Sequence, residues 1–261
     1  MILVIAGTSD SYRLIEELKK IDEEITATVT TNYGKKLLKD KFKIKVIKKR
    51  MEKDDLLSLF REKKIRAVID ASHPFAEEIT KKAIRAASEA EIDYLRFERE
   101  VVDLSQYQNP AAEIIKVKDY EKAAEKAAEF EKIFLTTGSK NAEIFLEEIY
   151  NYEKRLFLRV MLFPAFIKNL IDLGLPPANI IAMKGPFTKE FNQALFKEYG
   201  ADLIITKASG ASGGLKSKIE AAVELGIAVI VIQRPQINYP LVFDEVDNLI
   251  EYIKVNYKPE V

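Results

Sequence analysis

The chain has 261 residues, 48% of them hydrophobic and 31% charged, a globular balance that excludes a disordered chain. Lys and Arg together number 41, as do Asp and Glu, so no net field draws the chain to nucleic acid or an anionic membrane surface. With no Cys and one His, disulfides are excluded, and a zinc site or a Ser-His-Asp triad has little support. No apolar stretch approaches the ~18 residues of a membrane span and no basic leader precedes the first apolar run, so we expect a cytoplasmic protein.

Short apolar runs alternate with segments of helical period along the chain, a pattern typical of β-α units. The first part predicts strands at 2–6, 25–30, 44–47, 67–71 and 94–97, with helices at 12–20, 33–39, 53–64 and 75–90. The second part predicts strands near 113–117, 133–136, 156–160, 179–183, 202–206 and 228–232, with a last helix near 245–256. This alternation predicts α/β domains whose mostly parallel sheets are covered on both faces.

One polar, proline-containing segment, residues 104–112, interrupts this rhythm and is the best linker candidate. We therefore expect two domains, residues 1–108 and 109–261. Residues 3–9 and 133–139 both read as a strand, a glycine turn and a hydroxyl cap, and the strand ends at 68–72 and 204–209 echo each other in the same way. These echoes favour two related domains.

The turn after the first strand is a candidate ligand loop, because loops at the carboxyl ends of parallel strands line the ligand crevice. Gly7 permits a tight turn, and Thr8 or Ser9 either caps the following helix or binds a ligand anion. The G-x-G-x-x-G spacing of dinucleotide-binding proteins is absent. The second strand ends at residues 30–32, Thr-Thr-Asn, without the acid that would hold an adenosine ribose.

Three loops in the second part combine glycine with hydroxyl or cationic side chains, which suits a bound phosphate. They contain Thr137, Gly138, Ser139 and Lys140; Gly185, Pro186 and Phe187; and Lys207, Ser209, Gly210, Ala211, Ser212 and Gly213. Glycine lets the backbone approach a ligand closely, and the two lysines supply charge. Phe187 either lies on a ligand ring or points inward at a helix start.

The single histidine, His73, follows the strand at 67–71, and Pro74 suits the first turn of the helix expected from Phe75. A lone histidine is usually structural. Beside a helix amino terminus its imidazole is expected to stay neutral, which suits a hydrogen-bond partner.

Several ordered motifs together carry a family resemblance. Residues 70–76 read Asp-Ala-Ser-His-Pro-Phe-Ala, 94–99 Tyr-Leu-Arg-Phe-Glu-Arg, 136–141 Thr-Thr-Gly-Ser-Lys-Asn, 185–188 Gly-Pro-Phe-Thr, 206–210 Thr-Lys-Ala-Ser-Gly and 233–235 Gln-Arg-Pro. In order and spacing, from residue 2 to about 235, they resemble the precorrin-6A reductase family. Small departures are Asp10 where the family commonly has Glu, Ser72 for Thr, and Ala208 where an acid is frequent.

The resemblance implies two Rossmann-like domains facing each other across a ligand cleft. It also implies hydride transfer from NADPH or NADH to a double bond of a corrin-type tetrapyrrole, precorrin-6A or its cobalt complex. On this basis the cofactor-binding residues are expected in the three second-part loops named above. The substrate-binding residues are expected to be Gly7, Thr8, Ser9, Asp10, Ser72, His73 and Arg99.

The proton donor and the assembly stay open. A bound water or substrate group, His73 and Lys207 are the candidate proton donors, no resident metal is expected, and a monomer and a homodimer are both compatible with the sequence. The alternative functions are another nicotinamide-dependent reductase and a two-domain binding protein that closes on its ligand without chemistry.

Overall fold

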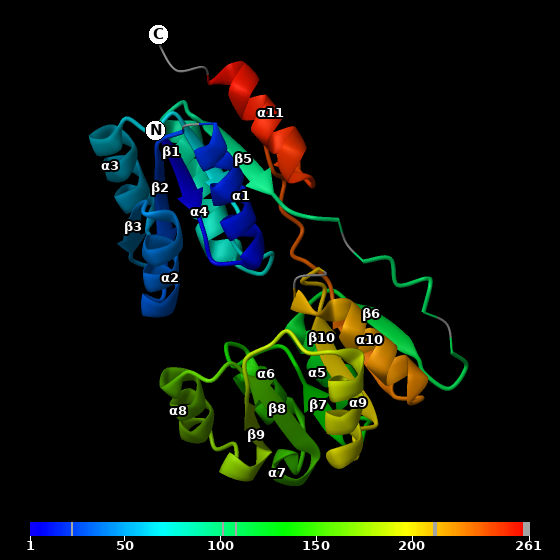
Figure 1. Cartoon of the computed structure of the whole chain (residues 1–261). Coiled ribbons are helices and arrows are strands. Elements are labelled where there is room, and N and C mark those ends of the chain that lie inside the picture. Colours follow the sequence, from blue (N-terminus) through cyan, green and yellow to red (C-terminus); the bar gives the residue numbers. More distant parts are fainter. Residues whose placement is uncertain (22, 101, 108, 211–212, 258–261) are drawn as a thin grey trace. The chain divides into compact units, whose positions relative to one another are not determined.

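The computed structural model describes residues 1–21, 23–100, 102–107, 109–210 and 213–257. The chain forms two compact units: unit 1 comprises residues 1–100 and 236–261, and unit 2 comprises residues 101–235 (Figure 1). Each unit contains a six-stranded sheet in which every neighbouring pair of strands is parallel. The predicted α/β class is confirmed.

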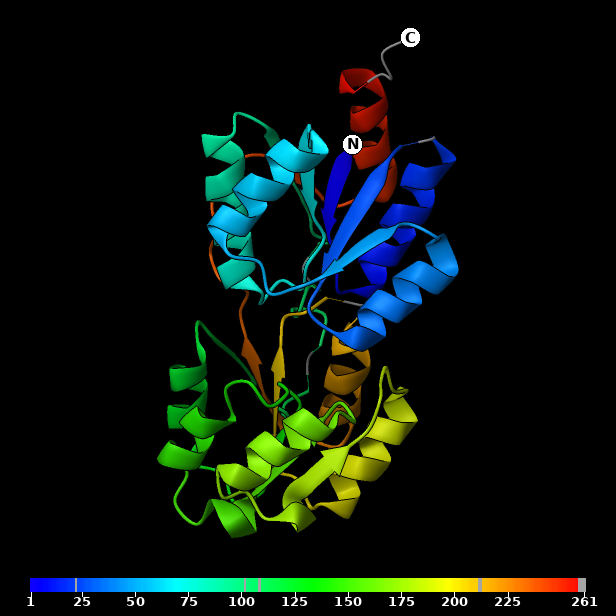
Figure 2. The same cartoon turned by 90° about the vertical axis from the view of Figure 1, so that its left-hand side faces the viewer.

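Unit 1 is a parallel sheet with helices on both faces. Its elements are β1 (Ile2–Ile5), α1 (Ser9–Lys20), β2 (Ile25–Val29), α2 (Asn32–Phe42), β3 (Lys45–Lys48), α3 (Lys53–Lys63), β4 (Ala67–Asp70), α4 (Glu77–Glu89), β5 (Asp93–Phe97), β12 (Val242–Phe243) and α11 (Val246–Asn256). Alternate residues of β1 serve the two faces, since Ile2 and Val4 pack with α1, α2 and α11, whereas Leu3 and Ile5 pack with α3 and α4 (Figure 2).

Unit 2 repeats this arrangement. Its elements are β6 (Ile114–Val117), α5 (Tyr120–Ala127), β7 (Ile133–Leu135), α6 (Ala142–Glu148), α7 (Tyr152–Arg155), β8 (Leu156–Val160), α8 (Pro164–Asp172), the 3-10 helix η1 (Pro177–Asn179), β9 (Ile180–Ala182), α9 (Lys189–Glu198), β10 (Leu203–Lys207), α10 (Leu215–Glu224) and β11 (Ala228–Ile232). Helices α9 and α10 cover one face, where Phe134 and Phe196 meet edge to face, and α5 and α6 lie on the other (Figure 2).

The two sheets have the same strand order. Unit 1 runs β12-β5-β4-β1-β2-β3, and unit 2 runs β6-β11-β10-β7-β8-β9. The echoes seen in the sequence therefore fall on equivalent strands, β1 with β7 and β4 with β10. In each sheet the edge strand given first in this order is displaced in the sequence. Strand β12 follows all of unit 2 in the chain, whereas β6 precedes the other strands of its own unit.

The division of the chain differs from the predicted one at residue 108. The boundary lies at residue 100, and the last helix belongs to unit 1 rather than to the second domain. The reason is that β12 pairs with β5 and α11 packs against α1. A strand of two residues has no recognisable hydrophobic period, so the sequence does not predict β12. The apolar face of α11 predicts that this helix packs against a sheet, but not against which of the two sheets.

Candidate functional site

Both sheets have a topological switch point, a place where neighbouring strands continue to opposite sides of the sheet. It lies between β1 and β4 in unit 1 and between β7 and β10 in unit 2. Ligands of doubly wound sheets bind outside the carboxyl ends of the strands at such points. The loops singled out in the sequence begin at these ends, after β1 and β4 in unit 1 and after β7 and β10 in unit 2.

In unit 1 the two switch-point loops are tied together. Thr8 caps α1 by accepting a hydrogen bond from the Ser11 backbone N–H at 3.2 Å, as the capping interpretation expected. Its hydroxyl also donates to the Ala71 carbonyl after β4, at 3.0 Å. Gly7 beside it is exposed, and nothing lies within 4 Å of the position that a Cβ would take. A ligand therefore has open access to this turn.

His73 lies in the loop between β4 and α4. The helix begins at Glu77, later than the expected Phe75, so Pro74 belongs to the preceding turn. The Phe75 backbone N–H donates to His73 Nδ1 at 3.2 Å. Because Nδ1 accepts this bond, a neutral imidazole carries its proton on Nε2.

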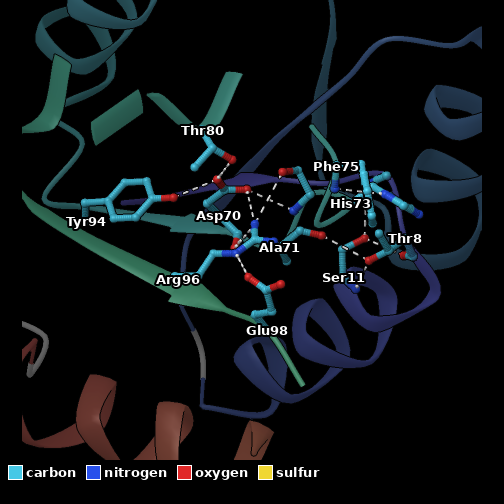
Figure 3. Close-up of polar contacts among 12 residues, drawn as sticks. Thr8, Ser11, Asp70, Ala71, His73, Phe75, Thr80, Tyr94, Arg96 and Glu98 are labelled. Carbon is cyan, nitrogen blue, oxygen red and sulfur yellow. Dashed lines mark hydrogen bonds and ion pairs between the residues drawn. The ribbon is translucent and has the colours of Figure 1, made fainter. Parts of the chain in front are cut away.

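Asp70, at the end of β4, is the centre of a buried polar network that the sequence reasoning did not assign to the site (Figure 3). Its Oδ2 accepts hydrogen bonds from the hydroxyls of Thr80 and Tyr94, at 2.6 and 2.7 Å. Its Oδ1 accepts from the Ser72 backbone N–H at 2.9 Å and pairs with Arg96 Nη1 at 3.0 Å. Burial, followed by the neighbouring Asp70 charge, raises the pKa of Tyr94, so its phenol stays protonated. The sequence does contain an indication of this network, because the cationic Arg96 lies within the largely apolar strand 93–97.

Asp10 and Arg99, both expected to contact substrate, instead form an ion pair with Nη2 and Oδ1 at 2.8 Å. Both side chains are partly exposed, so the pair is within reach of a ligand. Each charge is nevertheless largely balanced by the other, which lowers the attraction of Arg99 for an anion.

In unit 2 the loop after β7 is anchored to β10. Thr136 donates twice to the Ile205 carbonyl, from its backbone N–H at 2.8 Å and from its hydroxyl at 3.0 Å. Gly138 has a φ of 84°, and nothing lies within 4 Å of its added Cβ. Thr137 and Ser139 are buried, whereas Lys140 is exposed. The loop thus presents a glycine and an ammonium group outward.

The loops after β9 and β10 meet at the start of α10. The Ser217 hydroxyl donates to the Phe187 carbonyl at 3.0 Å, and the added Cβ of Gly214 lies 3.8 Å from Pro186. The half-buried Phe187 ring stacks on Phe191 at 5.1 Å between centroids.

The glycine loop itself is held by a motif from the end of the unit. Arg234 Nε donates to the Ala208 carbonyl at 2.8 Å. A Cβ on Gly213 would lie 2.2 Å from Ser209 Oγ, so only glycine fits there without a shift. Ala211 and Ser212 lie outside the described residues.

A cluster of cationic side chains, Arg159, Lys207 and Lys218, occupies the carboxyl edge of the unit 2 sheet. Arg159 is 7% exposed; its Nη1 donates to Asn192 Oδ1 at 2.8 Å, and its guanidinium lies 4.5 Å from the Phe187 ring centroid. Lys218, 8% exposed, donates to the Thr206 hydroxyl at 3.2 Å. We call these three residues the basic cluster; only Lys207 among them was predicted from the sequence.

Burial lowers the pKa of all three groups, and neighbouring cations lower it further for Lys218 and Lys207. The pKa of Lys218 falls to about 7 through burial and then the charges of Arg159 and Lys207. The pKa of Lys207 falls to about 8 through burial and the charge of Lys140, and that of Arg159 to about 10 through burial. A negative charge close to these groups would raise their pKa values again.

Among the residues that the structure describes, no three His, Cys, Asp or Glu side chains are grouped to hold a metal ion. No helix in the described ranges is long and apolar enough to cross a bilayer. The fold and its paired switch-point loops define a two-unit α/β protein of the Rossmann type, a class rich in nicotinamide-dependent enzymes.

Comparison with known proteins identifies the family. The family model for precorrin-6x reductase CbiJ/CobK matches residues 1–254. A cobalt-precorrin-6A reductase of Priestia megaterium is 42% identical, with 96% of each chain covered, and one of Methanocaldococcus jannaschii is 38% identical, with 97% of each covered. A solved structure of CobK precorrin-6A reductase superposes with a TM-score of 0.79 at 20% identity, covering 100% of this chain and 99% of that one, which supports the fold.

The chain therefore belongs to the precorrin-6x reductase family. It is a nicotinamide-dependent oxidoreductase of cobalamin biosynthesis that acts on a carbon–carbon double bond. This confirms the resemblance drawn from the ordered motifs.

Proposed function

We propose that the chain reduces one double bond of cobalt-precorrin-6A with NADPH or NADH, and that each unit binds one of the two reactants. The cobalt-containing substrate follows the names of the relatives from Priestia megaterium and Methanocaldococcus jannaschii. We assign the macrocycle to the loops of unit 2 and the dinucleotide to the loops of unit 1.

The observation that carries this assignment is the basic cluster. The groups that act on the pKa of Lys218 are the cations Arg159 and Lys207, and no carboxylate is among them. A corrin precursor carries many carboxylates, and carboxylates form charge-assisted hydrogen bonds with guanidinium and ammonium groups such as these. With Lys140 in the neighbouring loop, unit 2 offers cations to several carboxylates at one edge.

Unit 1 suits the dinucleotide better. Near its switch point Arg99 pairs with Asp10 and Arg96 pairs with Asp70, so neighbouring carboxylates already balance these two charges. Its exposed Gly7 turn opens a twelve-residue helix, α1, whose amino terminus favours a pyrophosphate. This reverses the assignment drawn from the motifs alone, because Arg159 and Lys218 stand outside those motifs.

The reaction requires the protein to position the two reactants and to supply a proton to the macrocycle. The bound nicotinamide supplies a hydride to one carbon of the macrocycle double bond, and a proton completes the neighbouring carbon. His73, with its proton on Nε2, and Lys207, whose pKa is about 8, remain the protein candidates for that proton beside a water or a substrate group.

The activity is tested by anaerobic mixing of the full chain with cobalt-precorrin-6A and either NADH or NADPH. We expect oxidation of at least one nucleotide that depends on the macrocycle. Absence of oxidation with both nucleotides would reject the proposed function.

The assignment of the units is tested by binding. Lys207→Ala and Lys218→Met should weaken macrocycle binding about tenfold or more and leave the NAD(P)H dissociation constant, followed by cofactor fluorescence, within about twofold. Lys216→Ala is the matched control, because Lys216 lies on α10 beside Lys218 but its side chain is 65% exposed. This variant should change neither dissociation constant. Weakened NAD(P)H binding in the Lys207 variant would instead return the cofactor to unit 2.

A further inference from the structure

The Arg96 guanidinium connects three parts of unit 1 (Figure 3). It is 1% exposed and pairs with Asp70 Oδ1 at 3.0 Å through Nη1. The same nitrogen lies 3.3 Å from the Asp70 carbonyl and 3.4 Å from Ser72 Oγ, and Nε pairs with Glu98 Oε2 at 3.0 Å. One planar group thus contacts both the strand end and the first residues of the His73 loop.

The returning C-terminal segment is attached to the same residue. The Arg96 backbone N–H donates to the Leu241 carbonyl at 2.8 Å, and that of Glu98 donates to the Phe243 carbonyl at 2.9 Å. The Tyr239 ring centroid lies 5.4 Å from the Arg96 guanidinium. Segment 239–243 therefore lies against Arg96 through both backbone and side-chain contacts.

A network of this kind is poorly explained by stability alone. Burying a carboxylate and a guanidinium costs about as much desolvation free energy as their attraction returns, and apolar residues of similar volume often stabilise as well. The ion pair also orients the loop. Asp70 accepts a hydrogen bond from the Ser72 backbone N–H, and Arg96 donates one to the Ser72 hydroxyl oxygen, so both ends of the pair hold the residue before His73.

We propose that Arg96 is a positioning residue, which holds Ser72 and His73 in the geometry that binds the reactant of unit 1. The inference rests on the proposed function only in naming that reactant as NAD(P)H. Lysine at this position keeps the charge but loses the planar fork, so it cannot serve Asp70, Ser72 and Glu98 at once.

The test is Arg96→Lys beside the control Arg66→Lys. Arg66 also forms a close ion pair in unit 1, with Glu23 at 2.5 Å, but it precedes β4 and so lies at the opposite end of that strand from Ser72. We expect Arg96→Lys to raise the KM for NAD(P)H about tenfold with little change in the macrocycle dissociation constant, and Arg66→Lys to change neither. Thermal unfolding of both variants separates this effect from lost stability.

A double-mutant cycle shows whether Arg96 acts through the loop. In the Ser72→Ala/His73→Ala background, Arg96→Lys should add less than about twofold to the KM, because the residues it positions are already gone. Should Arg96→Lys fail to fold, Tyr239→Leu, which removes the ring over the guanidinium, gives a second and milder variant with the same expected change in KM.

The outcomes separate this inference from the proposed function. If Ser72→Ala and His73→Ala raise a KM while Arg96→Lys and Tyr239→Leu leave both KM values unchanged, the positioning role is wrong. If all four variants raise the KM for the macrocycle instead, the positioning role is supported and the assignment of NAD(P)H to unit 1 is wrong. Unchanged KM values in every variant would reject both.

Discussion

Lys207 and Lys218 differ from ordinary lysines in that their charge is lost close to neutral pH. The pKa of Lys207 is lowered to about 8 and that of Lys218 to about 7, burial being the main cause in both. Below these values both ammonium groups are present to meet an anion, and above them neither is. Binding of a polycarboxylate should therefore depend on pH in a range where most lysines do not titrate.

We predict that the macrocycle dissociation constant rises between pH 7 and 9 in the wild-type chain, by an order of magnitude or so. In Lys207→Arg the rise should be smaller, because a guanidinium stays charged throughout this range. Anaerobic titration at several pH values, with the nicotinamide absent, measures this. A steeper or unchanged rise in the arginine variant would show that Lys207 does not meet the macrocycle.

Gly138 is constrained by its backbone conformation. Its φ of 84° is a conformation that residues with a Cβ avoid, although a Cβ there would touch nothing. Gly138→Ala should lower the free energy of unfolding by about 1–2 kcal/mol through strain. Denaturant unfolding checks this, and a loss below about 0.5 kcal/mol would mean that the loop relaxes freely.

At the scale of elements, α11 belongs to unit 1, although it follows unit 2 in the chain. Ile253 is fully buried there in the cluster that contains Leu14 and Leu18 of α1. Ile253→Ala should destabilise by about 2–4 kcal/mol, whereas Val255→Ala, 65% exposed on the same helix, should stay within about 0.5 kcal/mol.

Hydrogen exchange locates the effect of that change. Protection in Ile253→Ala should fall in β1, β2 and α1 while β7 and β10 keep theirs. Loss confined to unit 2 would contradict the packing of α11 described above.

Periodicity sufficed to predict the strands near 2–6, 67–71 and 202–206 and the loops that follow them, because each strand is an apolar run bounded by a turn. It could not predict β12, whose two residues have no period, or its pairing with β5, since a local pattern does not name a partner. The same limit explains the misplaced domain boundary.

The site was only half visible for a related reason. Turns rich in glycine and hydroxyl residues can be recognised in a sequence from their residue types. Arg96 and Arg159 each lie inside an apolar strand, at a position where burial without a partner would be costly, and this signal went unused. Lys218 offered none, because a lysine on a helix is ordinary until the fold buries it.

For the whole molecule, the two depressed lysine pKa values predict how stability depends on pH. The folded pKa values, about 7 and 8, lie below the value of ~10.4 expected in the unfolded chain. At pH values between the folded and the unfolded pKa, the unfolded state therefore binds more protons than the folded state. The free energy of unfolding of the unliganded chain should therefore receive a contribution that rises with pH from about 7 to about 10.

Comparing wild type with Lys218→Met isolates the Lys218 part, because other titrating groups are common to both. The variant should be the more stable of the two at pH 7, and its stability should rise less between pH 7 and 9. Denaturant unfolding at the two pH values provides the comparison. If the two chains show the same dependence on pH, Lys218 is not titrating in this range.

Isotope labelling of the transferred hydrogen tests the proposed reduction. Nicotinamide carrying deuterium at the transferable C4 position is mixed anaerobically with the chain and cobalt-precorrin-6A, and the macrocycle is examined by mass spectrometry. We expect a dihydro product with one deuterium from the nicotinamide and one hydrogen from solvent. A reduced macrocycle without deuterium, or an unreduced one beside unoxidised nicotinamide, would contradict it.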